Sequence, residues 1–183
     1  LADQGVYFAS ESSFYRILHQ EGLQNHRGGA RPARHSRPSP LTATGPNQVY
    51  TWDITYMKSP VKGRFFYLYL FVDVWSRKIV GWRVEECESP DFAAELAVVI
   101  HTAEGLIPGQ VRLHSDNGGP MKGATMLATL QALGIVPSFS RPSVSNDNAF
   151  SEALFRTLKY RPGYPSRAFE DLQAARDWVA DFV

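Results

Sequence analysis

The spacing of apolar and polar residues predicts three strands in the first half of the sequence. Residues 49–57 alternate between two kinds of side chain, which predicts a strand with Thr51, Asp53 and Thr55 on one face. Residues 65–74 are almost entirely aromatic or aliphatic, as in a strand that is covered on both faces. Residues 79–86 follow after a short turn. The three segments together predict an antiparallel meander.

In the second half of the sequence, apolar residues at helical spacing alternate with short apolar segments. Ser89-Pro90-Asp91 is a common helix start, and four apolar residues follow it at helical spacing: Phe92, Leu96, Val99 and Ile100. A short strand over 111–115 ends at Asp116, a helix over 121–133 is closed by Gly134, and a strand over 135–139 precedes two more helices. The order βββαβαβαα predicts an α/β fold, in which helices flank a mixed five-stranded sheet.

The first 48 residues have a different character. Residues 1–25 hold one helical pattern, with caps at 10–13 and a stop at Gly22, and we expect it to be the remnant of a helical module. Residues 26–48 are rich in Pro and Gly and hold four arginines, at 27, 31, 34 and 37, with no acid between them. A run of this kind can neutralise phosphates, although it is also typical of a solvated linker. The prediction is a basic linker over 26–48 and a core domain over 49–183.

Composition narrows the class of protein. The 183 residues are 44% apolar and 20% charged, enough for one domain with an extension. The longest apolar run reaches Asp73 after eight residues, which excludes a membrane-spanning helix. The single cysteine, Cys87, excludes an internal disulfide or a multi-thiolate zinc site and fits a reducing compartment. No signal-peptide pattern or initiator Met is present, so we expect a cytosolic fragment. A net charge of +1 does not identify a nucleic-acid-binding protein.

Three acids stand out as candidates for chemistry. Asp53 interrupts an otherwise apolar and hydroxyl-bearing strand, and a buried carboxylate is costly unless it is paired, protonated or bound to a metal. Asp116 ends a strand and precedes Asn-Gly-Gly, which indicates an open loop. Glu152 follows Asn146-Asp147-Asn148 and lies in the first turn of a predicted helix.

At 100° per residue, the helix around Glu152 places two cations beside the acid. Arg156 lies 40° and Lys159 20° from Glu152, while an apolar face opposite is predicted from Phe150, Leu154 and Leu158. An ordinary amphipathic helix with an intrahelical Glu–Arg pair is the plain alternative. Three carboxylates could hold two divalent ions for phosphodiester cleavage, and the two cations could hold the DNA backbone.

Other residues compete for these roles. Asp73 adjoins a tight turn, where an Asp commonly accepts backbone hydrogen bonds. Asp147 is predicted to be a helix cap, and His114 to be a packed side chain, so neither joins the catalytic set.

The motifs around these acids resemble a known family. They are Val49-Tyr-Thr-Trp-Asp53-Ile-Thr-Tyr, Phe71-Val-Asp73-Val-Trp-Ser-Arg, His114-Ser-Asp116-Asn-Gly-Gly and Asn146-Asp-Asn-Ala-Phe-Ser-Glu152, followed by Lys159. Together they are similar to the integrase core of bacterial insertion-sequence transposases of the OrfB type, in the retroviral-integrase superfamily. The family's motif leaves 35 residues between its second aspartate and its glutamate, as do Asp116 and Glu152 here.

The resemblance implies a ribonuclease-H-like fold and a DNA strand transferase with Asp53, Asp116 and Glu152 as catalytic and metal-binding residues. It implies Mg²⁺ or Mn²⁺, two ions, as cofactor, and DNA ends and target DNA as partners of at least a dimer in the bacterial cytoplasm, at the nucleoid. We expect DNA contacts from six residues: Arg156, Lys159, Asn117, Arg141, Arg31 and Arg34. Relatives continue beyond residue 183, so we expect a core that is truncated at its C-terminus.

The remaining alternatives differ in class. A truncated DNA-binding or oligomerisation module without chemistry would also use this fold, and the isolated fragment would then be inactive. A glycosidase needs only two carboxylates and gives no role to the third acid or to the cations beside it. A tyrosine recombinase would use Tyr160, but the basic residues it needs lie mostly in the linker.

Overall fold

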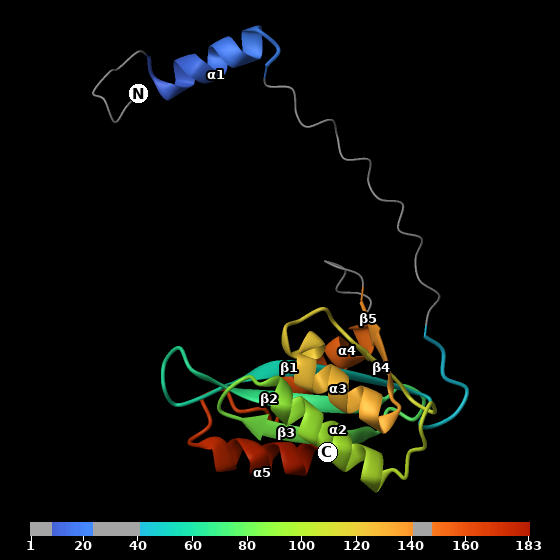
Figure 1. Ribbon diagram of the computed structural model, residues 1–183. Helices are drawn as coiled ribbons and strands as arrows, with labels where there is room; N and C mark the ends of the chain where they lie inside the picture. The colour runs from blue at the N-terminus through green and yellow to red at the C-terminus, as the bar shows by residue number, and fades with distance from the viewer. Residues whose placement is uncertain (1–8, 24–40, 141–147) are drawn as a thin grey trace. The chain divides into compact units, whose positions relative to one another are not determined.

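The computed structural model describes residues 9–23, 41–140 and 148–183 (Figure 1). The chain divides into two compact units, residues 1–40 and residues 41–183. In the first unit the described part holds helix α1 (Glu11–Gln20), where the sequence predicts one. The Ser10 hydroxyl accepts a hydrogen bond from the Ser13 N–H, and Gly22 has the left-handed φ of 67° just after the helix. Of the predicted linker, residues 26–40 lie outside the described residues, with Arg31 and Arg34 among them.

The second unit is built on one mixed sheet of five strands. Its order is β3-β2-β1-β4-β5. The first three strands in the chain pair antiparallel, whereas β1 and β4, and β4 and β5, pair parallel. This is the predicted meander followed by crossovers. The strands are β1 (Val49–Lys58), β2 (Phe65–Asp73), β3 (Ile79–Glu85), β4 (Arg112–Ser115) and β5 (Val136–Phe139).

The helices of this unit occur in the predicted order. They are α2 (Pro90–Ala103), the short helix η2 (Pro120–Lys122), α3 (Ala124–Leu133), α4 (Ala149–Tyr160) and α5 (Leu172–Phe182). The helix predicted over 121–133 is interrupted at Gly123, so η2 and α3 are separate. Gly134 has φ 68° and ends α3, as predicted. No helix in the described residues is long and apolar enough to span a membrane.

Two apolar clusters show which helices cover which face of the sheet. One cluster holds Tyr50 and Trp52 together with side chains of α2 and α3. The other holds Met57 together with side chains of α4 and α5. Because successive strand residues face opposite sides, Thr51, Asp53 and Thr55 lie on the α4 and α5 face of β1. The face of β1 that carries the predicted acid is therefore the face on which α4 packs.

Candidate active site

Asp53 lies in the middle of β1 and is half-buried. Its Oδ1 accepts a hydrogen bond from the Ile54 N–H at 2.8 Å. Burial, the largest cause, and the nearby charges of Asp116 and Glu152 together raise the pKa of the Asp53 carboxyl to about 7, against the lowering effect of the Ile54 hydrogen bond. The three predicted acids therefore interact electrostatically, although they come from β1, the loop after β4 and α4.

Asp116 follows β4 directly, at the end of the strand that pairs with β1. Thr51 of β1 pairs with His114 of β4, and the two strands are parallel, so Asp53 on β1 and Asp116 in the loop after β4 are each two residues beyond this pair. The Asp116 Oδ1 accepts a hydrogen bond from the Gly118 N–H at 2.8 Å. A Cβ at residue 118 would lie 3.0 Å from that oxygen, so the glycine leaves room for the turned carboxylate.

Glu152 lies in the first turn of α4 and is exposed. The buried face of α4 is formed by Ser151, Phe155 and Leu158. The prediction for Phe150 was wrong: its side chain is 37% exposed, and the Arg77 guanidinium lies 4.0 Å from its ring centroid. The helix is therefore rotated from the predicted orientation, because Phe155 packs in the core while Phe150 is covered by the arginine.

This rotation affects the two cations on α4 differently. Lys159 is half-buried, and burial lowers the pKa of its ammonium group. Arg156 is exposed, and no ion pair joins it to Glu152. The plain alternative of an intrahelical Glu–Arg pair is thus not what α4 shows.

The remaining predicted DNA contacts are placed as follows. The Asn117 amide nitrogen donates to the Ser140 carbonyl, so this side chain ties the loop after β4 to the end of β5. Arg141 lies outside the described residues, as does Asp147. The first described residue of the α4 cap is Asn148, whose side chain makes no capping hydrogen bond.

The competing residues behave as predicted from the sequence. The Asp73 Oδ2 accepts hydrogen bonds from the Ser76 N–H at 3.0 Å and from its hydroxyl at 2.6 Å, as in a tight turn. His114 is buried, with Nδ1 3.1 Å from the Ser138 hydroxyl oxygen and Nε2 3.3 Å from that of Ser140. Asp73 is thus a turn residue and His114 a packed side chain.

The acids suit a divalent metal in donor type. Carboxylate oxygens are the ligands that Mg²⁺ and Mn²⁺ prefer, and Asp53 lies on β1 while Asp116 directly follows β4, the strand paired with it. Within residues 9–23, 41–140 and 148–183, however, no three His, Cys, Asp or Glu side chains form a group close enough to hold an ion. The role of Asp53, Asp116 and Glu152 as joint metal ligands therefore stays a prediction.

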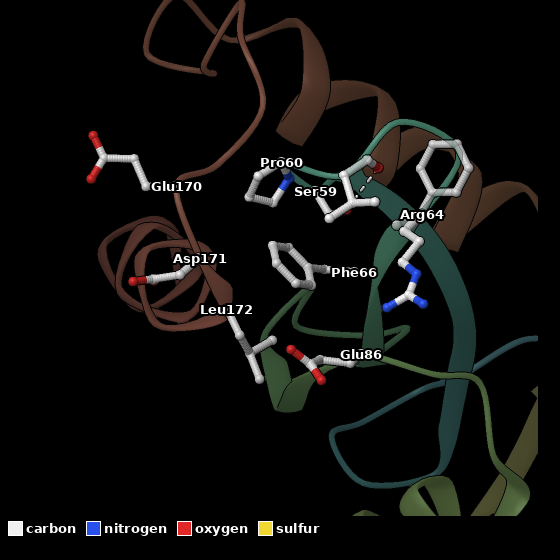
Figure 2. A pocket seen from close by; sticks show the side chains of 10 residues that line it. Ser59, Pro60, Arg64, Phe66, Glu86, Glu170, Asp171 and Leu172 are labelled. Carbon is white, nitrogen blue, oxygen red and sulfur yellow. Dashed lines mark hydrogen bonds between the residues drawn. The ribbon is translucent and has the colours of Figure 1, made fainter.

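A hollow elsewhere on the second unit has no part in this site. It has a volume of about 240 Å³ and lies between the β1–β2 turn, the end of β3 and the start of α5. Figure 2 shows the ring of Phe66 at its centre, with Arg64, Glu86 and Asp171 around it. None of the described residues that line it belongs to β4 or α4. None of the three predicted acids lines this hollow.

Comparison with known proteins places these observations in a family. A family model described as integrase core domain matches residues 43–145, a span that includes Asp53 and Asp116 and ends before Glu152. The transposase for insertion sequence element IS904 of Lactococcus lactis subsp. lactis (strain IL1403) is 32% identical over 159 residues, covering 85% of this chain and 58% of that protein. The chain spans about half the length of the curated relatives it matches.

Solved structures share the fold at low sequence identity. The catalytic domain of Mos1 mariner transposase has a TM-score of 0.57 at 12% identity, covering 74% of this chain and 69% of that chain. A chain of the simian T-cell lymphotropic virus intasome, solved in complex with PP2A regulatory subunit B56 gamma, has a TM-score of 0.54 at 19% identity, covering 93% and 60%. The predicted ribonuclease-H-like fold and the resemblance to integrase cores are confirmed.

Proposed function

The chain belongs to the integrase core domain family, and on that premise we propose that it is the catalytic core of an insertion-sequence transposase. The observation that carries the proposal is the match of residues 43–145, which include Asp53 and Asp116, to the integrase core domain. The pKa of Asp53, raised by burial and by the charges of Asp116 and Glu152, supports it. Like charges drawn from three separate elements are costly for stability and are typical of a site that binds cations. The bacterial relatives that match most of this chain are named transposases.

The reaction is phosphodiester cleavage followed by strand transfer. In the first step the oxygen of a water molecule attacks phosphorus at the end of the element, and the P–O3′ bond breaks to leave a 3′-hydroxyl and a 5′-phosphate. In the second step that 3′-hydroxyl attacks a phosphodiester of target DNA, and the target's own 3′ oxygen leaves with a proton. Neither step consumes an external energy source, because the first is the hydrolysis of a phosphodiester and the second replaces one phosphodiester bond by another.

The residues have distinct roles in this proposal. Asp53 on β1 and Asp116 directly after β4 form the half of the site next to the sheet, and α4 carries Glu152. The three carboxylates would hold Mg²⁺ or Mn²⁺, two ions in this proposal, and these would lower the pKa of the attacking water and stabilise charge on the leaving oxygen. Arg156 and Lys159, on the same helix as Glu152, bind the phosphates next to the scissile bond. Asn117 and the arginines at 31, 34 and 141 are further candidates for contact with DNA.

Partners and location follow from the same proposal. Two DNA segments, the end of the element and its target, must meet at one site, and a dimer or larger assembly would bring two element ends together. The bacterial cytoplasm, at the nucleoid, is where such a protein finds its DNA. Residues 1–25 as the end of a DNA-recognition module, 26–48 as a basic linker and 49–183 as the core remain the proposed domain division.

The experiment compares single variants in a metal-dependent nicking assay. Supercoiled plasmid DNA is incubated with the 183-residue chain in Mn²⁺, in Mg²⁺ or in EDTA, and nicked circles are quantified. Asp53→Asn, Asp116→Asn and Glu152→Gln should each reduce nicking at least 100-fold. Asp181→Asn, an exposed acid on α5, is the matched control and should keep the parent rate. Full nicking by all three site variants would refute the proposal.

An inert DNA-binding or oligomerisation module is the second candidate. It is favoured by the lack of a three-ligand metal group in the described residues. Calorimetric titration with Mn²⁺ separates the two functions. Heat that disappears in Asp53→Asn supports the enzyme, whereas no carboxylate-dependent binding supports the module.

A further inference from the structure

Buried hydrogen-bonding residues gather at the ends of β4 and β5, next to Asp116. His114, Ser115 and Ser140 are only 7%, 2% and 7% exposed. The pairing of β4 with β5 ends at Ser115 and Phe139, so Asp116 lies just past the last pair of these two strands. Further contacts are therefore needed to fix the segment that carries this acid.

Ser140, which directly follows β5, is hydrogen-bonded to both chain neighbours of Asp116. On one side, its backbone N–H and its hydroxyl both donate to the Ser115 carbonyl, at 2.9 and 3.2 Å. On the other side, the Asn117 amide nitrogen donates to the Ser140 carbonyl. Residues 115 and 117 are thus attached to one residue at the end of β5, and Asp116 lies between them.

Two further hydrogen bonds reach Asp116 itself. The Ser115 hydroxyl donates to the Asp116 carbonyl at 3.1 Å, and the Gly118 N–H donates to the Asp116 Oδ1 at 2.8 Å. A fully bonded polar network defines one arrangement of its groups, whereas apolar packing alone is less specific. The backbone on both sides of the acid and the direction of its carboxylate therefore belong to one network.

The Ser140 hydroxyl has a single hydrogen, and this sets the direction of its second bond. Because the hydrogen is donated to the Ser115 carbonyl, the Ser140 oxygen accepts from His114 Nε2 at 3.3 Å. On the other side of the ring, His114 Nδ1 lies 3.1 Å from the Ser138 hydroxyl oxygen. Within the described residues the Ser138 hydroxyl makes no hydrogen bond to residues 115–117. Two serines thus contact the same histidine, and only the hydroxyl of Ser140 also holds the segment around Asp116.

We propose that Ser140 and Asn117 are positioning residues, which attach residues 115–117 to the end of β5 and so fix the direction of the Asp116 carboxylate. The inference rests on the proposed function, because that direction matters for chemistry only where Asp116 binds a metal ion. Groups that orient metal ligands from behind contribute to metal affinity without touching the ion. The bond to Ser140 uses one N–H of the Asn117 amide, and the other N–H and the oxygen remain for the DNA contact predicted from the sequence.

The first test measures Mn²⁺ binding and stability in the 183-residue chain. Ser140→Ala removes the hydroxyl, Ser140→Thr keeps it, and Asn117→Leu removes the amide at similar size. Ser138→Ala is the matched control, because it removes the other hydroxyl that contacts His114. Free Mn²⁺ is quantified by electron paramagnetic resonance, and the free energy of unfolding is measured in urea.

We expect Ser140→Ala and Asn117→Leu each to weaken Mn²⁺ binding about tenfold, as loss of a group that orients a metal ligand does. Ser140→Thr and Ser138→Ala should bind within about twofold of the parent. Ser140→Ala and Ser138→Ala each remove one partner of His114, so any loss of stability should be similar in the two. A difference in Mn²⁺ binding between them then comes from the segment around Asp116.

Three results would overturn the inference. The first is parent-like Mn²⁺ binding by Ser140→Ala or by Asn117→Leu. The second is an equal loss of binding in Ser138→Ala, which would trace the effect to His114. The third is an equal loss in Ser140→Thr and Ser140→Ala, which would show a packing role. If Ser140→Ala did not fold, Asn117→Leu would decide alone.

A second measurement needs no metal and so separates this inference from the proposed function. The Gly118 N–H donates to Asp116 Oδ1, so its hydrogen exchange reports whether the carboxylate keeps its direction. Exchange of this amide should rise about tenfold in Ser140→Ala and Asn117→Leu and stay unchanged in Ser138→Ala. If the parent chain failed to bind Mn²⁺, the proposed function would fall, yet this exchange pattern would still decide whether the two residues hold the segment. Unchanged exchange at Gly118 in both variants would overturn the inference by itself.

Discussion

Thr51 of β1 and His114 of β4 are paired on two adjacent parallel strands, and Asp53 and Asp116 each lie two residues further along the chain. Asp53 lies on the face of β1 that α4 covers, because side chains two residues apart on a strand share a face. Asp116 lies in the loop directly after β4. Glu152 depends instead on how α4 lies on β1. Strand pairing thus positions the two segments that carry the aspartates, and helix packing positions Glu152.

The first prediction concerns the stability of the metal-free chain against pH. The pKa of Asp53 rises from 3.8 to about 7 on folding, so between these values the folded state retains a proton that the unfolded state has released. The Asp53 carboxyl therefore lowers the free energy of unfolding by a growing amount as pH rises from about 4 to about 7. Above that range the reduction is constant. Asp53→Asn should raise the free energy of unfolding at pH 8 by on the order of 2 kcal/mol and hardly change it at pH 4. Urea unfolding in EDTA at four pH values checks this.

Asp181→Asn serves as the control for that series, because Asp181 is an exposed acid on α5. Its difference from the parent should stay within about 0.5 kcal/mol at every pH. Parallel curves for Asp53→Asn and the parent chain would show that Asp53 titrates as an ordinary surface acid. The electrostatic argument for a shared site would then be lost.

The second prediction separates the two neighbours of Asp53. Both Asp116 and Glu152 raise the pKa of Asp53, and the influence of Asp116 is the larger. Asp116→Asn and Glu152→Gln should therefore each lower the pKa of Asp53, the first variant more than the second. Carboxyl carbon NMR titration of the metal-free chain gives this pKa directly. If the pKa of Asp53 in Glu152→Gln equalled that in the parent chain, the Glu152 side chain would lie beyond electrostatic reach of Asp53.

The third prediction concerns DNA binding through α4. Each phosphate contact that is lost should reduce the dependence of log affinity on log salt by about 1. Arg156→Ala and Lys159→Met should each do so, and methionine retains the half-buried stem of Lys159. Fluorescence anisotropy with a labelled 30-base-pair duplex over a range of salt provides the slope. Lys78→Ala is the control because Lys78 already pairs with Glu104 at 2.6 Å. A slope unchanged in both α4 variants would assign DNA binding to another surface.

Much of the fold could be predicted from local patterns in the sequence. The alternation around Asp53 and the apolar stretch of β2 defined the meander, and Gly134 and the Ser89 cap marked helix ends, because these signals act within a few residues. The tight turn at Asp73 was likewise a local prediction. Where several neighbouring residues determine the outcome, the sequence was sufficient.

Features set by distant contacts were harder to predict. Phe150 was assigned to the core by its angle on the helix, but the orientation of α4 is determined by Phe155 against the sheet and by Arg77 from the β2–β3 turn. Asn148 was recognised as part of a cap, yet only the packing of α4 on β1 shows that its amide nitrogen donates to the Trp52 carbonyl.

The last prediction tests the packing of β3 against α2 through Gly81. A Cβ at this position would lie 2.5 Å from both Cδ1 and Cγ1 of the buried Ile100, and 3.3 Å from Leu96 Cδ1. Gly81→Ala therefore requires Ile100 to shift within a packed core, which should lower the free energy of unfolding by about 1–3 kcal/mol.

Gly119→Ala is the matched control, because no atom lies within 4 Å of the added carbon and the φ of −54° suits alanine. We expect it to be neutral or to stabilise the chain by up to about 1 kcal/mol. Urea unfolding followed by tryptophan fluorescence compares the two variants. Equal stability of both variants would mean that α2 can move away from β3 without cost. The helix would then not be a rigid support for the sheet face opposite the acids.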